Sequence, residues 1–495
     1  MNIQGLTTRV VGVSAWPLVL ILVASAVLFS TTAAAQSNRI RLPDFGDSSG
    51  GVLTRSDEAR LGEAFLREIL ASKDLLKDPE VQAYVNDIGF KLVEASEAGR
   101  TPFRFVVFDD PLINAFAGPT GVIGVNSGLL LAARNESEFA AVVAHEIAHV
   151  TQRHLARAFE LDDRNSIATM AGVLAALVLA SQSSEAGQAA LATVIGSRAQ
   201  SQLDFTRANE VEADAIGIEI LAAAGFDPRA MATFFEQLQT SHRYLGLPPE
   251  FLSTHPVTTS RIGESRGRAE RYSYKQYQDS PEFAFAKAKL RVLTEGASKS
   301  LEAFARELKQ GAGSHPGAVR YGQGLALMGL KRWKEADPVL AKLVHQYPKA
   351  HSVLDAYSTV LFHLGAVGRA EKLLRDRLEV YLFDRVLTLA LGRLLVDDSR
   401  ADEAVALLNA YVQREPHDAS AYELLAKAYD RRGETAASYA ALAENRYYTG
   451  RLLLAIQHLE QAQRAGDGDY YLGSQIDARL ETMRNEHTSR VARRN

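Results

Sequence analysis

Two histidines and a glutamate in one short string carry the clearest chemical signal in the chain. Residues 142–150 read Val-Val-Ala-His-Glu-Ile-Ala-His-Val, which places His145 and His149 four residues apart. On an α-helix such residues share one face, so both imidazoles can bind one ion at about 2.0–2.1 Å. Glu146 is turned toward the open coordination position, where it can take a proton from metal-bound water. The string therefore predicts a catalytic zinc site for peptide-bond hydrolysis, with Glu146 as general base.

The simpler alternative is a pair of surface histidines on an ordinary helix. In a chain with 12 histidines, a chance match to this pattern is expected on the order of a few hundredths of a time. The string also lies among Val, Ile and Ala, where an uncompensated polar group costs roughly several kcal/mol. The metal-site interpretation is therefore favoured.

A catalytic zinc needs a third protein ligand in addition to its open position. Residues 150–155 (Val-Thr-Gln-Arg-His-Leu) lack the glycine and third histidine of metzincins, so this ligand must come from elsewhere. Glu210 and Asp214 are four residues apart and share a helix face, whereas Glu212 between them would point away. One of the pair can bind the ion while the other hydrogen-bonds a ligating histidine or the reacting centre. Spacing alone leaves a solvated acidic helix start, favoured by the helix dipole, equally open.

His255 is a further candidate, in the string Ser253-Thr254-His255-Pro256, with Arg261 six residues later. A fourth imidazole can stabilise charge on the tetrahedral intermediate, or it can occupy the open metal position as an inhibitory ligand. A purely structural role in holding the loop is the alternative. We favour the inhibitory role, which would make the protein a latent protease.

The elements that must position these residues can be read from the flanking sequence. Asp78-Pro79 predicts a helix start, and residues 102–108 and 121–125 read as strands just before a long helix beginning near Glu136. An apolar run at 167–180, followed by an Ala-rich stretch at 187–195, is too short to span a bilayer. Two interpretations stay open for this region, a buried core helix and a membrane-facing or lid-like hairpin.

From about residue 318 a 34-residue period predicts paired helices of the tetratricopeptide type. Four small residues recur one period apart, and bulky residues recur at a second phase, as expected where small side chains let helices approach closely. The small column is Gly324, Ser358, Gly392 and Ala426, and the bulky columns are Leu327, Leu361, Leu395 and Tyr429 and Leu340, Leu374, Leu408 and Leu442. Weaker units are expected at 283–309 and 451–486.

Length and composition bound the remaining possibilities. The chain has 495 residues, 47% of them hydrophobic and 23% charged, which predicts more than one globular domain. A formal net charge of −4 gives no broad basic surface for nucleic acid. The absence of cysteine excludes disulfides and thiolate metal sites. Residues 1–35 resemble a cleaved export signal, with an uncleaved membrane helix as the alternative. We expect a metalloprotease domain at 36–275 and a repeat domain at 276–490.

The motif His145-Glu146-x-x-His149 followed by Glu210-x-x-Ala-Asp214 resembles the HtpX and CAAX-prenyl-protease family of gluzincins. An export signal and C-terminal repeats are similar, within that family, to the periplasmic beta-barrel assembly-enhancing proteases, which carry the same Ser-Thr-His-Pro string near the metal. The resemblance implies a mainly α protein, with an α+β gluzincin-type domain that contains a small β-sheet, followed by an α-solenoid of repeats. It implies that His145, His149 and Glu210 bind one zinc ion, that Glu146 is the base and that Asp214 is a supporting or proton-donating carboxylate.

The same resemblance marks a strand region along which such enzymes place the substrate. Its candidate residues here are Asn114, Phe116 and Val125. Relatives often have two glycines after the proline of this region, whereas this chain has Thr120-Gly121. This departure concerns the local turn and not the chemistry.

Two functions of different class follow. The first is an exported, periplasmic zinc endopeptidase that degrades misfolded or misassembled outer-membrane proteins, with repeats that dock substrates or the outer-membrane assembly machinery. The second is a non-proteolytic chaperone or scaffold that acts through the repeats. Glu146 favours the first, because a structural zinc needs no general base. Peripheral membrane contact is compatible with both, whereas an integral prenyl-type protease is disfavoured for lack of spanning segments after residue 35.

Overall fold

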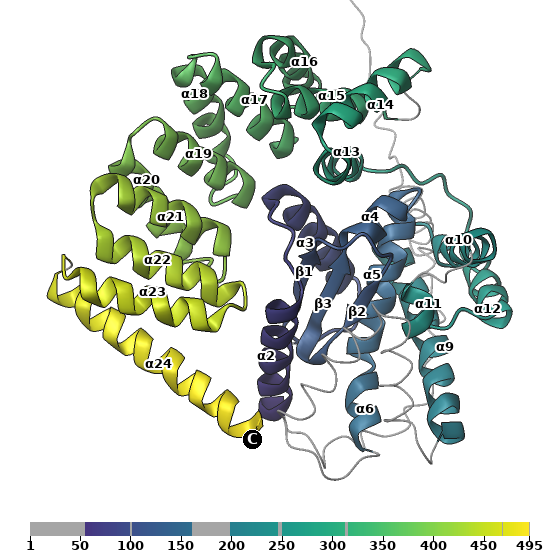
Figure 1. Cartoon of the computed structure of the whole chain (residues 1–495). Coiled ribbons are helices and arrows are strands. Elements are labelled where there is room, and N and C mark those ends of the chain that lie inside the picture. Colours follow the sequence, from purple (N-terminus) through teal and green to yellow (C-terminus); the bar gives the residue numbers. More distant parts are fainter. Residues whose placement is uncertain are drawn as a thin grey trace, which may run out of the picture. The chain divides into compact units, whose positions relative to one another are not determined.

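A computed structural model describes residues 55–99, 101–160, 199–245, 250–311, 315–467 and 469–494 (Figure 1). The expected export signal at 1–35 and the apolar stretches at 167–180 and 187–195 lie outside these residues. Residues 51–495 form one compact unit. Within the described part, no helix combines the length and the apolar character needed to cross a membrane.

A three-stranded sheet lies in the N-terminal half, with the strand order β1-β3-β2. β1 (Arg104–Phe108) is parallel to the central strand β3 (Val122–Asn126), and β2 (Ala115–Ala117) is antiparallel to it. Alternate side chains of β1 enter different cores. Phe105 and Val107 pack toward the helices of the site, whereas Val106 and Phe108 pack toward α2 (Arg55–Ser72). Both predicted strands are confirmed, and apart from the terminal Arg104 and Asn126 they carry no polar side chain, because both faces of the sheet are covered.

The long helix predicted near Glu136 is α5 (Glu136–Thr151), and it is buried along nearly its whole length. Asn135 caps it by accepting a hydrogen bond from the backbone N–H of Glu138. The predicted start at Asp78 is also confirmed, because the Asp78 side chain caps α3 (Pro79–Glu94). α5 packs on β2 and β3 of the sheet and also on α9 and α10, so it lies between the sheet and helices that follow it in the chain.

Further helices complete the N-terminal half around α5. The longest, α9, packs along α5, and a Cβ added at Gly217 would lie 3.3 Å from the backbone nitrogen of His145. Glycine at this position therefore lets the two helices approach at the metal-binding string. These remaining helices are α4 (Ser127–Ala132), α6 (His154–Glu160), α9 (Ala199–Ala223), α10 (Ala230–Leu245), α11 (Glu250–Thr254) and α12 (Thr259–Ala269).

The turn at Thr120-Gly121 is a short 3₁₀ segment, Pro119–Gly121, that leads into β3. Thr120 has φ +58 and Gly121 has φ +74, so both lie in the left-handed region that favours glycine. A Cβ at Gly121 would also lie 2.3 Å from the carbonyl oxygen of Pro102. The turn therefore keeps the left-handed geometry that two glycines would favour, although a threonine occupies its first such position.

The C-terminal half is a succession of antiparallel helices, in which each helix packs on the next (Figure 1). The alternate helices α15, α17, α19 and α21 also pack on one another, as in an α-solenoid. The fold class predicted from the sequence is thus confirmed. The helices are α13 (Pro281–Glu295), α14 (Ala297–Lys309), α15 (Pro316–Gly329), α16 (Trp333–Gln346), α17 (His351–His363), α18 (Val367–Leu378), α19 (Arg385–Asp397), α20 (Ala401–Val412), α21 (Ala419–Arg432), α22 (Thr435–Tyr448), α23 (Leu452–Ala465) and α24 (Tyr470–Arg494).

The repeat columns explain how the two helices of a unit approach. A Cβ at Gly324 would lie 2.7 Å from Leu340 Cδ2, and one at Gly392 would lie 2.9 Å from Leu408 Cδ2. The small residue of the first helix therefore faces the leucine of the second helix in the same unit. The column of small residues and the column of leucines that the sequence identified therefore contact each other, with the leucine side chain against the backbone at the small residue.

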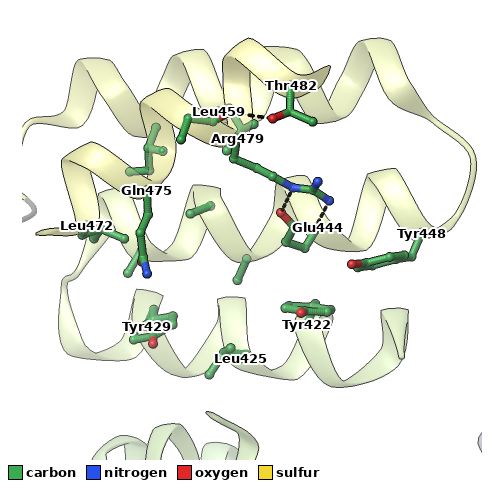
Figure 2. A pocket seen from close by; sticks show the side chains of 15 residues that line it. Tyr422, Leu425, Tyr429, Glu444, Tyr448, Leu459, Leu472, Gln475, Arg479 and Thr482 are labelled. Atoms are coloured by element: carbon green, nitrogen blue, oxygen red, sulfur yellow. Dashed lines mark hydrogen bonds and ion pairs between the residues drawn. The ribbon is translucent and has the colours of Figure 1, made fainter. Parts of the chain in front are cut away.

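At the end of the described repeats, α23 packs mainly on α22, and α24 packs on α23. Between α21, α22 and α24 lies a pocket of about 580 Å³ (Figure 2). Alanines of α22 line it together with Tyr422 and Tyr429 of α21 and Leu472 of α24. Arg479 and Glu444 form a two-pronged ion pair beside it, with N–O distances of 2.7 and 2.8 Å.

Candidate metal centre

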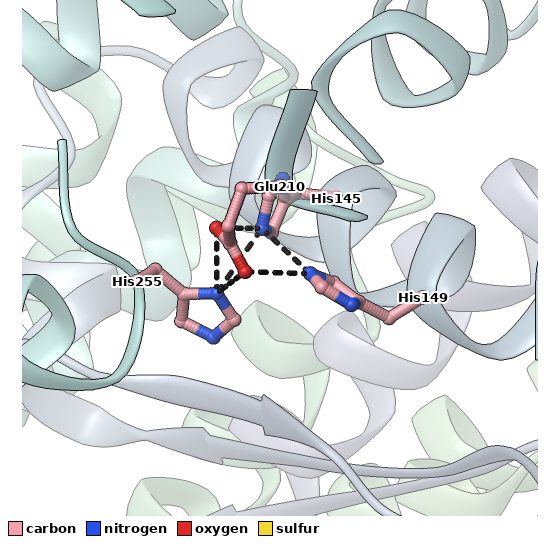
Figure 3. Close-up of side chains that lie close together, drawn as sticks. All are labelled: His145, His149, Glu210 and His255. Carbon is pink, nitrogen blue, oxygen red and sulfur yellow. Dashed lines mark hydrogen bonds and ion pairs between the residues drawn. The ribbon is translucent and has the colours of Figure 1, made fainter. Parts of the chain in front are cut away.

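Three elements bring four potential ligand side chains together: α5, α9 and the loop after α11. α5 supplies His145 and His149, α9 supplies Glu210, and the loop supplies His255 (Figure 3). One ligand atom from each of the four lies within 4.8 Å of the others. All four sequence candidates for the metal therefore converge.

The distances among these atoms fit one tetrahedral ion. Bonds of about 2.0–2.1 Å to a tetrahedral metal separate its ligand atoms by about 3.3 Å. His145 Nε2 lies 3.0 Å from His149 Nε2 and 3.4 Å from Glu210 Oε2. His149 Nε2 lies 3.3 Å from Glu210 Oε1. Two imidazoles and a carboxylate are also a donor set that catalytic zinc uses.

His255 lies at the remaining corner of this arrangement. Its Nδ1 is 3.3 Å from His145 Nε2 and 3.0 Å from Glu210 Oε1. Its Nε2 is 3.5 Å from Glu146 Oε1. The ring packs on Phe251 with a centroid distance of 4.8 Å, so the imidazole is held toward the ligands.

Glu146 is fully buried, and neither of its carboxylate oxygens has a hydrogen-bond partner among the described residues. A buried carboxylate without such partners is costly. It is therefore retained for a role that the fold itself does not require. Its position next to the ligands suits a group that exchanges protons with a reacting molecule.

Asp214 and Arg261 form a second layer behind His145 and Glu210. Asp214 Oδ1 lies 3.0 Å from His145 Nδ1. Arg261 contacts both oxygens of Asp214 at 2.8 Å, and its Nη1 is 2.8 Å from Glu210 Oε2. Asp214 thus contacts the imidazole of His145, and its supporting role stays a prediction. The role of Arg261 was missed, although its spacing from His255 was visible.

Charge in the site is divided unevenly. Burial opposes a charge on His145, but the carboxylates of Asp214 and Glu210 raise the pKa of this imidazole to about 10. Burial lowers the pKa of His149 to about 4, although Glu210 acts in the opposite direction. For Glu210, burial favours the neutral acid, but His255, His145 and His149 hold its pKa well below the ordinary value. The ligand set thus contains an ionised carboxylate, as binding of a cation requires.

The predicted substrate strand is placed more narrowly by the sheet. Phe116 and Val125 have buried side chains, and Val125 lies on β3, which has a neighbour on each side. β2 is an edge strand within the described sheet. The backbone of β2, next to the buried Asn114, thus lies at the edge of the described sheet, and contact of this region with a substrate stays a prediction.

Glu212 does not join the ligand atoms, as its spacing predicted. It instead contacts His154 and Arg157, an arrangement that the sequence interpretation did not identify. The signal available was His154 itself, five residues after His149 and just beyond the predicted helix.

A helix with two histidines one turn apart, a carboxylate from a second helix and a buried glutamate beside them define a metallopeptidase. Residues 79–269 match peptidase family M48. A Vibrio cholerae relative is 36% identical over 91% of this chain and 94% of its own length. The beta-barrel assembly-enhancing protease of Escherichia coli K12 is 34% identical over 94% of this chain and 96% of its own. The mitochondrial metalloendopeptidase OMA1 of Schizosaccharomyces pombe is 32% identical over 36% of this chain and 50% of its own.

This chain belongs to the beta-barrel assembly-enhancing proteases of peptidase family M48. The family predicted from the sequence is thereby confirmed, and so is its assignment as a metalloendopeptidase.

Proposed function

We propose that this protein is an exported, periplasmic zinc endopeptidase that degrades misfolded or misassembled outer-membrane proteins. The buried carboxylate of Glu146, which accepts no hydrogen bond from the described residues, lies beside His145, His149 and Glu210 and carries the proposal. The names of the relatives place proteases of this kind in beta-barrel assembly. A catalytic domain at 36–275 and a repeat domain at 276–490 fit the gap between α12, which ends at Ala269, and α13, which begins at Pro281.

In this mechanism His145, His149 and Glu210 would hold the zinc ion, and Asp214 would orient His145. The metal, when bound, polarises the substrate carbonyl and lowers the pKa of water toward about 7. Glu146 takes the proton of the attacking water and delivers it to the leaving amine. Asp214 is held by Arg261 and so keeps the His145 ring in place.

His255 regulates access in this proposal. Its Nδ1 lies at the fourth corner of the ligand set, and its Nε2 faces Glu146. In this position it excludes both water and the substrate carbonyl. The enzyme is thus latent until the loop after α11 moves.

The repeats dock the substrate or the assembly machinery. The pocket between α21, α22 and α24 favours this role, because its tyrosine and aliphatic lining suits an apolar segment of an unfolded chain (Figure 2). A chaperone activity of the repeats is the second candidate function and rests on the same pocket. It does not require the metal.

The decisive experiment compares the intact protein with Glu146→Gln for zinc content and for cleavage of a urea-unfolded outer-membrane β-barrel protein. We expect both to bind about one zinc ion per chain. Cleavage should fall by at least about a thousandfold in the variant, as for loss of a general base. Glu219→Gln on the exposed side of α9 is the matched control. Equal cleavage by Glu146→Gln and the intact protein would remove the enzyme assignment to this site.

A further inference from the structure

The second ring nitrogen of His149 has its own partner, outside the ligand set. His149 Nδ1 lies 2.9 Å from His154 Nδ1. His154 Nε2 lies 3.1 Å from Glu212 Oε2, and Arg157 Nη2 lies 2.9 Å from the same oxygen. His154 is 4% exposed, so this series of contacts begins in the interior.

A strained break in the helix creates the contact. α5 ends at Thr151 and α6 begins at His154. Residues five apart on one continuous helix are rotated by about 140° and do not face each other. Between the two helices Arg153 has φ +53, a left-handed conformation that costs a residue with a Cβ roughly 1–2 kcal/mol. The chain adopts this strain at the point that turns His154 back onto His149, as strained residues near functional sites often do.

The contacts, together with metal binding through His149 Nε2, determine which ring nitrogens carry protons. A carboxylate only accepts hydrogen bonds, so His154 Nε2 must donate to Glu212. Only one hydrogen fits between the two Nδ1 atoms. If His154 supplied it, a neutral His149 would carry its own proton on Nε2, which faces Glu210 and His145. Ligation therefore requires that His149 donates from Nδ1 and that His154 accepts.

The two histidine ligands then have parallel supports. Behind His145 stands Asp214, which Arg261 holds. Behind His149 stands His154, followed by Glu212, which Arg157 holds. Both carboxylates come from α9. Orienting partners of this kind set the tautomer and the basicity of a metal-binding imidazole.

We propose that His154 and Glu212 are positioning residues that hold His149 as its Nδ1–H tautomer, with the Nε2 lone pair directed at the metal. This inference rests on the metal site of the proposed function. It gives a role to His154 and Glu212, which have none in the proposed mechanism. It also explains why His154 is buried at a break between two helices.

The test measures zinc affinity in the full chain by competition with a chromophoric chelator. His154→Leu should weaken binding by about 10–100-fold, as loss of such partners does at other sites. His154→Asn retains an acceptor near the Nδ1 position and should bind within about threefold of the intact protein. Glu212→Ala should also weaken zinc binding. Because the Glu212 side chain is 26% exposed, this variant provides the test if His154→Leu does not fold. Glu219→Ala is the control on the same helix.

A second readout uses Co²⁺ in place of zinc. The visible absorption of bound Co²⁺ reports ligand geometry, and it should shift in His154→Leu but not in His154→Asn. Equal affinity of His154→Leu and the intact protein, or equal losses in the Leu and Asn variants, would overturn the inference. If the intact protein binds zinc and cleaves its substrate, and His154→Leu has the same zinc affinity, only this inference is wrong. An intact protein that binds no zinc would end the proposed function as well.

Discussion

His255 Nδ1 lies 3.3 Å from His145 Nε2, the distance expected between two ligands of one tetrahedral ion. The two residues are 110 positions apart in the chain. A catalytic zinc with three protein ligands leaves its fourth position to water or substrate. An imidazole from a loop at that corner therefore competes with the reaction.

His255→Ala is expected to raise proteolysis. Removal of the imidazole opens the fourth position and frees the surroundings of Glu146 Oε1, which lies 3.5 Å from His255 Nε2. We expect a gain on the order of tenfold in the cleavage rate, which corresponds to about 1.4 kcal/mol. The measurement is the initial rate of cleavage of an unfolded β-barrel protein at saturating zinc.

The control for this change is His458→Ala in α23, far along the chain from the ligands, which should leave the rate unaltered. A rate for His255→Ala equal to or below that of the intact protein would instead assign His255 to substrate binding, charge stabilisation or loop structure. Latency would then be wrong.

The residues predicted from the sequence are those whose partners lie one helical turn away or within one repeat unit. His145 and His149, the helix around them, and the facing columns of Gly324 and Leu340 are of this kind. A local period fixes such contacts before any tertiary structure is known. The link from Glu210 to the site needed the resemblance to a family, because α9 is separated from α5 in the chain.

The contacts that the sequence did not reveal depend on irregular backbone. His154 reaches His149 only because Arg153 adopts a positive φ, and Arg261 reaches Asp214 from a helix that follows the His255 loop. Neither contact follows from a repeating spacing in the sequence. The short β2 strand was likewise marked only as part of a substrate region, since three residues carry too little pattern to define a strand.

Packing of the repeats makes a separate prediction at Gly324. Gly324→Val places branched carbons where Leu340 Cδ2 would lie 2.7 Å from the Cβ. The helix pair must separate or Leu340 must move, so we expect a loss of about 1–3 kcal/mol in unfolding free energy. Urea denaturation followed by circular dichroism measures it. Gly368→Ala in α18, where an added Cβ meets nothing within 4 Å, should cause no loss and raise stability by up to about 1 kcal/mol. Similar losses in both variants would contradict the close approach.

The pocket at the end of the repeats predicts a separation of binding from catalysis. Ala440 lines the pocket, so Ala440→Trp places an indole ring in it. We expect weaker suppression of the aggregation of an unfolded β-barrel protein, with cleavage of a short peptide within about twofold of the intact protein, because a peptide needs only the metal site. Light scattering and a fluorogenic peptide give the two readouts. Ala303→Trp in α14 is the size-matched control, and an equal loss of aggregation suppression in that variant would argue against a role for the pocket.

A buried cluster at Glu80 predicts how stability depends on pH. Glu80 accepts a hydrogen bond of 2.8 Å from the Tyr321 hydroxyl, and Lys289 Nζ lies 2.8 Å from its other oxygen. Burial raises the pKa of Glu80 to about 8, against the effect of Lys289, while Asp78 and Asp355 add to the rise. Arg393 also pairs with Asp355. Three carboxyls thus share two cations, and a proton on Glu80 balances the cluster.

The sign of the effect follows from proton binding. Between the ordinary carboxyl pKa of 4.5 and the value of about 8, the folded protein binds more protons than the unfolded chain does. The free energy of unfolding should therefore be highest below about pH 4.5 with respect to this group. It should fall by up to about 1.4 kcal/mol per pH unit, until the contribution is lost above pH 8.

Glu80→Gln tests this linkage, because the amide keeps an oxygen for Tyr321 and cannot ionise. Thermal unfolding midpoints measured from pH 5 to pH 9 should decline less steeply in the variant than in the intact protein. At pH 9 the variant should be the more stable of the two. The exposed Glu302→Gln on α14 should follow the intact protein at every pH. Parallel curves for Glu80→Gln and the intact protein would mean that Glu80 is ionised in the fold, with Lys289 supplying the compensating charge.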